Sequence, residues 1–149
     1  MINRPRLLYL LVLLWFVLSG IFVNWGWFSL SYFTVLPIWL EPVKPLIPQL
    51  YFGYMISTIV WFVFSSLFII IAYGTFKKHK WVWTTSIIIS TIFLVVFGLM
   101  LAAFMVNAVM FQDWFSIYGL ISVVLSILID LGIIFLLTRP IIKKFFDIN

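Results

Sequence analysis

The hydrophobic residues of this chain fall into four long runs that short or polar stretches separate. The runs cover about residues 7–23, 51–76, 81–110 and 115–137. A helix needs about 20 consecutive apolar residues to cross the roughly 30 Å hydrocarbon core of a bilayer. The runs are continuous and do not alternate with polar residues, which argues against the strands of a membrane barrel. The pattern therefore predicts an all-α integral membrane protein, in which residues 1–149 form one bundle of four transmembrane helices.

The connections between the runs differ in length. Residues 77–80 join the second and third runs so closely that these two helices must be antiparallel neighbours. The first and second runs are joined by a long outer loop, residues 24–50, that is rich in aromatic residues and proline. We expect a membrane-surface segment over 28–40, followed by an extended polyproline II segment.

The outer loop has two open interpretations. It caps the bundle and pads the membrane interface, or it forms a docking surface or lid for a partner, because exposed aromatic patches mark contact sites. The candidate contact residues are Trp25, Trp27, Trp39, Pro42, Pro45 and Pro48.

The basic residues predict how the chain is oriented in the membrane. Eight of the nine Lys and Arg residues fall on one side of the four runs, and only Lys44 falls on the other. The eight are Arg4, Arg6, Lys77, Lys78, Lys80, Arg139, Lys143 and Lys144. Because loops rich in Lys and Arg stay in the cytoplasm, we expect a multi-pass protein of the plasma membrane with both termini cytoplasmic.

Composition supports the membrane assignment and narrows the partners. Of the 149 residues, 66% are hydrophobic and only 9% are charged, whereas a soluble domain carries about a quarter charged residues. The net charge of +5 comes from residues that flank the runs. There they meet anionic headgroups, so we expect membrane lipids and other integral membrane subunits as partners, and no nucleic acid.

Several kinds of chemistry lack the residues that they need. Cysteine is absent, which excludes disulfides, thiolate nucleophiles and cysteine-ligated metals. The one histidine, His79, lies in the basic turn, and the four acidic residues are scattered along the chain, with no metal-ligand spacing. We therefore expect no cofactor, no metal and no enzymatic activity.

One charged residue interrupts the apolar runs. Asp130 lies seven residues before the end of the last run, at a depth of about 10 Å. A charge there costs at least a few kcal/mol, so we expect the carboxyl to be protonated or hydrogen-bonded. Steps of three and four residues place it on one helix face with small and polar residues, which should face other helices. This intramembrane polar stripe consists of Gly119, Ser122, Ser126 and Asp130.

Residues at a similar depth on the other helices are candidate partners for Asp130. They are Trp15, Ser65, Ser66, Ser86, Ser90 and Thr91. Two interpretations follow. Asp130 is a neutral acid that holds helices together, or it is a proton or cation site, which is the default for an acid inside a membrane.

Two short stretches of the sequence resemble known proteins: YGTFKKHKWVW at 73–83 and LLTRPIIKKFF at 136–146. They resemble small uncharacterised four-helix integral membrane proteins of archaea and bacteria, in which a glycine, a basic turn and a tryptophan pair join the middle helices. The matching residues are Gly74, Lys77, Lys80, Trp81, Trp83, Thr138, Arg139, Pro140, Lys143 and Phe146. The resemblance implies the four-helix fold and its topology, and it brings no catalytic residue.

These observations lead to two functional hypotheses. The first is a non-catalytic structural or accessory subunit of a larger membrane protein complex, because the chain is small, lacks cofactor ligands and has an aromatic outer loop suited to contact. The alternative is a small proton- or cation-coupled transporter or channel that uses Asp130.

Overall fold

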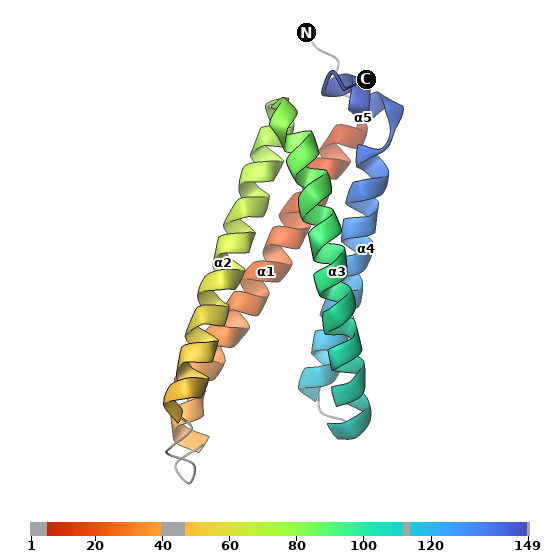
Figure 1. Ribbon diagram of the computed structural model, residues 1–149. Helices are drawn as coiled ribbons and strands as arrows, with labels where there is room; N and C mark the ends of the chain where they lie inside the picture. The colour runs from red at the N-terminus through yellow and green to blue at the C-terminus, as the bar shows by residue number, and fades with distance from the viewer. Residues whose placement is uncertain (1–5, 40–46, 112–113, 149) are drawn as a thin grey trace.

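The computed structural model describes residues 6–39, 47–111 and 114–148, and over these ranges the chain is almost entirely helical, with short turns at 77–79, 138–139 and 146–148 and no strands (Figure 1). The helices are α1 (Arg6–Trp39), α2 (Ile47–Phe76), α3 (Lys80–Phe111), α4 (Trp114–Leu137) and the short α5 (Pro140–Phe145). The predicted all-α fold is confirmed.

Four of these helices are long and apolar enough to cross a membrane. The qualifying segments are Arg6–Ser31, Met55–Phe76, Lys80–Ala103 and Ile117–Leu137, with mean hydropathies from 2.4 to 2.8. Each overlaps one of the runs predicted from the sequence. These are the features of a multi-pass membrane protein.

The long outer loop is the main point at which the structure differs from the prediction. Helix α1 continues to Trp39 and α2 begins at Ile47, so residues 24–39 and 47–50 are helical. The prediction of a surface segment and loop there is wrong, because residues 24–39 continue α1 and some of their aromatic side chains pack on neighbouring helices. Trp25, for example, lies 5.7 Å from Trp61 between ring centroids. Pro48 lies in the first turn of α2, where proline is tolerated, whereas the predicted polyproline residues Pro42 and Pro45 lie outside the described residues.

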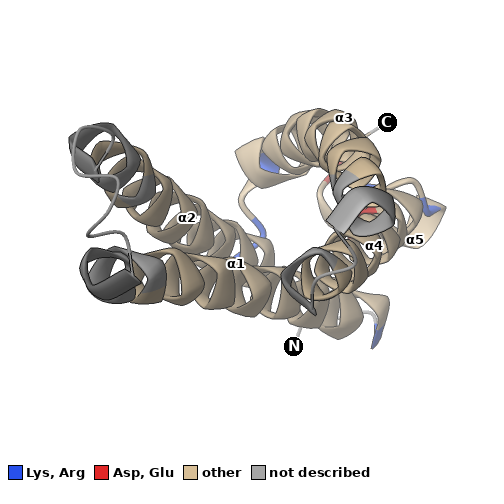
Figure 2. Cartoon of the chain, turned by 90° about the horizontal axis from the view of Figure 1, so that it is seen from below, with Lys and Arg blue, Asp and Glu red and all other residues tan. Residues whose placement is uncertain are grey.

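The long helices form two hairpins, α1 with α2 and α3 with α4. Contacts within each hairpin are extensive, and α1 also packs against α4, whereas α2 and α3 touch at few residues. The hairpins therefore diverge from the α2–α3 turn, as Figures 1 and 2 show from two directions. The described Lys and Arg residues all lie at the end that holds this turn, the start of α1 and α5; we call it the basic end.

The centre of the protein is an aromatic cluster. Phe22 of α1 meets Phe68 of α2 edge-to-face at 4.9 Å and Phe93 of α3 at 5.3 Å between ring centroids. Trp15 stacks on Phe68 at 5.5 Å. Such pairs contribute about 0.5–1.5 kcal/mol beyond the burial of their area. The cluster thus joins three helices where the two hairpins still touch.

Small residues let α1 and α2 approach each other closely. The hydroxyls of Ser19 and Ser65 are 2.8 Å apart, and those of Ser29 and Ser57 are 3.3 Å apart. Between these pairs, a Cβ added to Gly26 would lie 3.3 Å from the ring of Phe62. Small side chains and interhelical hydrogen bonds are what hold helices together within lipid.

At the basic end, two tight contacts fix the connections. A Cβ added to Gly74 would lie 2.5 Å from Val82 Cγ2, so only glycine fits the α2–α3 turn without a shift. The indole nitrogen of Trp83 donates to the carbonyl of Leu137 at the end of α4, at 3.1 Å. Helix α5 then begins at Pro140, and proline suits the first position of a helix.

Candidate functional site

Asp130 is the natural centre of a candidate site. Its side chain lies in α4 and is 0% exposed. Helix α1 lies against α4 at this level, since a Cβ added to Gly132 would be 3.5 Å from Leu14 Cδ1. The structure also places Gly119 and Ser126 of the polar stripe in the interior, with Ser122 half-buried. Ser126 donates to the carbonyl of Ser122 at 2.8 Å, so its hydroxyl is satisfied within α4.

Four buried polar side chains from three helices have no hydrogen-bond partner among the described residues. They are Trp15 of α1, Ser86 and Ser90 of α3 and Asp130 of α4. We call them the buried polar group. Counted from the basic end, they lie six to ten residues into their helices, at about 9–15 Å. Ser90 lies beside the Asp130 carboxyl without the geometry of a hydrogen bond.

The chemistry of the buried polar group favours an internal role. The Trp15 indole is only a donor, the two hydroxyls donate and accept, and a protonated carboxyl can do both. A carboxylate would have to remain charged in an apolar interior, which is costly without a partner. Because the carboxyl has no exposed surface, it can exchange a proton or bind a cation only if the helices move apart.

Three of the predicted partners of Asp130 bond elsewhere, which corrects that prediction. Ser65 pairs with Ser19 across the α1–α2 contact, at 2.8 Å. Ser66 donates to the Phe62 carbonyl and Thr91 to the Ile87 carbonyl, and both of these side chains are exposed. A helical hydroxyl can always use the carbonyl four residues earlier, so shared depth alone does not identify a partner. The three other predicted residues, Trp15, Ser86 and Ser90, are the ones left in the buried polar group.

The predicted contact residues of the outer loop are only partly within the described side chains. Trp25 is half-buried against α2, so it stabilises the hairpin. Trp27 is 65% exposed. The side chains of Trp39, Pro42, Pro45 and Pro48 lie outside the described part of the structure.

No metal site is found in the ranges that the structure describes, where no three His, Asp or Glu side chains come together.

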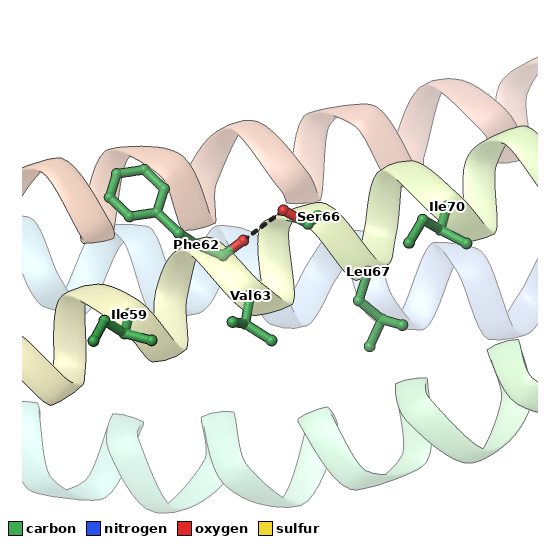
Figure 3. Close-up of a pocket in the computed structure, with 6 residues that line it drawn as sticks. All are labelled: Ile59, Phe62, Val63, Ser66, Leu67 and Ile70. Atoms are coloured by element: carbon green, nitrogen blue, oxygen red, sulfur yellow. Dashed lines mark hydrogen bonds between the residues drawn. The ribbon is translucent and has the colours of Figure 1, made fainter.

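A groove along α2 was not foreseen from the sequence. It has a volume of about 520 Å³, and its lining residues are Ile59, Phe62, Val63, Ser66, Leu67 and Ile70 (Figure 3). These residues belong to a run that is apolar on all sides of the helix. The periodicity of hydrophobic residues therefore does not predict which face of α2 carries the groove. All six lining residues belong to α2.

Comparison of this chain with protein families, with curated proteins and with solved structures gave no match. The resemblance of residues 73–83 and 136–146 to small four-helix membrane proteins therefore stays a prediction.

Proposed function

We propose that this chain is a non-catalytic accessory subunit of a larger membrane protein complex. The observation that carries the proposal is the closed interior around Asp130. The side chain best suited to transport chemistry is fully buried, and the other unpaired buried side chains at a similar depth are hydroxyls and an indole. Such a group suits a static contact between helices better than a pathway.

The α1–α2 hairpin supplies the surface for contact. Its helices contain 34 and 30 residues, which correspond to lengths of about 51 and 45 Å. Both exceed the roughly 30 Å hydrocarbon core of a bilayer. The hairpin therefore extends past the core, away from the basic end, and it exposes Trp27 beyond the middle of α1. Tryptophan is among the residues most enriched where proteins bind each other.

The test is purification in a gentle detergent, followed by mass spectrometry of the proteins that remain attached. We expect Trp27→Ala to release the partner while the bundle keeps its thermal stability. Leu13→Ala is the matched control, because Leu13 is also exposed on α1 but lies fourteen residues nearer the basic end. A clean homo-oligomer with no other protein attached would contradict the proposal.

A second candidate is a small proton- or cation-coupled transporter that uses Asp130. It is favoured by the unpaired polar atoms that α1, α3 and α4 bring to one level, since an intramembrane acid is by default a functional site. Proton or cation flux into liposomes that contain the purified protein would support it, provided that Asp130→Asn abolishes the flux and leaves the fold intact.

A further inference from the structure

The groove on α2 has the dimensions of an elongated apolar ligand. From Ile59 to Ile70 it follows eleven residues of helix, or about 17 Å. In Figure 3 the side chains of Val63 and Leu67 point towards the gap that separates α2 from α3, whereas Phe62 points towards α1. The groove lies within Met55–Phe76, the segment apolar enough to cross a membrane.

The lining of the groove suits a lipid chain better than a protein helix. Five of its six residues are aliphatic or aromatic, and the Ser66 hydroxyl already donates to the Phe62 carbonyl at 2.9 Å. Helices that associate in lipid use small residues for close approach or hydrogen bonds between side chains. This lining has bulky branched side chains and no free polar group, so a flexible acyl chain fits it better.

The same helix face continues to a positive charge. Ile59, Val63, Ser66, Ile70, Tyr73 and Lys77 recur at steps of three or four residues and therefore share one side of α2. The Lys77 amide donates to the Tyr73 carbonyl at 2.9 Å, which keeps the helical path, and the Lys77 ammonium lies 5.7 Å from the Tyr73 ring. From Ile70 to Lys77 is about 10 Å along the axis, which takes the face from the acyl region towards the headgroups.

The charges at this turn are available to a ligand. Lys78 is paired with Asp147, its ammonium 3.2 Å from a carboxylate oxygen. Lys77 and Lys80 are exposed and have no carboxylate partner among the residues that the structure describes. An apolar groove on a helix face that continues to the Lys77 ammonium, with the exposed Lys80 three residues further along the chain, is complementary to an amphipathic anion.

We propose that this face of α2 is a binding site for an anionic phospholipid, with one acyl chain in the groove and the phosphate at Lys77 and Lys80. The site is independent of the accessory role proposed above, because it needs no protein partner.

The test uses the full chain in detergent with defined phospholipids, and native mass spectrometry counts the lipid that stays bound. We expect phosphatidylglycerol to be retained in preference to phosphatidylcholine, on the order of tenfold, since each lysine near a membrane surface strengthens binding to anionic lipid. Changing Lys77 and Lys80 to Ser should abolish the preference. Val63→Phe should reduce the retention of both lipids by filling the groove, and Ile59→Phe, nearer the other end, is a second groove variant.

Matched controls separate this site from general surface effects. Lys143→Ser with Lys144→Ser removes two charges elsewhere at the basic end, and Leu128→Phe enlarges a side chain on α4 that is 61% exposed, compared with 59% for Val63. Neither control should change retention. The proposal is overturned if the controls act as strongly as the site variants, if the groove variants leave retention unchanged, or if inorganic phosphate displaces the lipid. It is also overturned if the groove variants release a protein and not a lipid.

Discussion

Substitutions of the single residue Asp130 distinguish the two functional hypotheses, an accessory subunit and a proton- or cation-coupled transporter. Asp130→Asn keeps the shape and the ability to hydrogen-bond, but it removes the titratable proton. We expect Asn to be tolerated, with thermal stability in detergent close to that of the parent protein. Asp130→Leu should lower the thermal stability more than Asn does, because it places an apolar side chain against the buried hydroxyl of Ser90 that lies beside the carboxyl.

Measuring proton or cation flux into liposomes that contain the purified protein distinguishes an accessory subunit from a transporter. We expect no proton or cation flux that depends on Asp130. Robust flux in the parent protein, lost with Asn as completely as with Leu, would contradict the accessory role and favour a transporter.

Gly74 allows a second prediction for a single residue. Its added Cβ would lie 2.5 Å from Val82 Cγ2 in a closely packed turn, and overpacking costs about 1–3 kcal/mol. We therefore expect Gly74→Ala to destabilise the protein by about that amount in thermal unfolding, and Val82→Ala to restore part of the loss. Gly20→Ala is the control, because nothing lies within 4 Å of its added Cβ. Equal effects of the two glycine substitutions would show that the turn is not closely packed.

The sequence predicted which residue of α4 matters but not all of its surroundings. The stripe that ends at Asp130 combines small and polar residues, and this is enough to place it against other helices. The pairing of Ser65 with Ser19 depends on how α1 and α2 are rotated about their axes. Both helices are apolar on nearly every side, so hydrophobicity gives no signal of that rotation.

At the scale of the helices, the continuation of α1 beyond residue 23 can be tested directly. The chain has no cysteine, so an engineered pair is unambiguous. Ser29 and Ser57 have hydroxyls 3.3 Å apart, and we expect Ser29→Cys with Ser57→Cys to form a disulfide under mild oxidation. The measurement is a mobility shift that a reducing agent reverses.

The control is Ser29→Cys with Ser66→Cys, whose second site lies nine residues further along α2, or about 14 Å away. It should not cross-link efficiently. Equal cross-linking of both pairs would indicate the long loop that was first expected at 24–50.

The same region shows why hydropathy located the spans but not the helix ends. A hydropathy window identifies apolar segments, and each of the four predicted runs overlaps a long apolar helix. A helix, however, continues for as long as its side chains find a surface to pack on. After position 23, Trp25 packs on Trp61 of α2 and Phe28 stacks on Tyr118 of α4.

At the scale of the whole molecule, the distribution of basic residues predicts how the protein is oriented in the membrane. All described Lys and Arg residues lie at the basic end, and the positive-inside rule predicts that this end is cytoplasmic. We expect reporters fused after Phe146 or inserted within 77–80 to report a cytoplasmic location, and one inserted near Pro45 to report the outside. An outside signal from the 77–80 turn would contradict the four-span topology.

The division into two hairpins has a consequence for synthesis at the ribosome. Most contacts of α1 are with α2, the helix that follows it in the chain, so the Ser19–Ser65 bond can form before α3 and α4 have been translated. Trp15 lies on the same hairpin, and its depth in the bundle matches that of Asp130 only after α4 has been translated and has packed against α1. N-terminal units generally fold first, and here the last long helix to leave the ribosome would shield the most polar level of the interior from lipid.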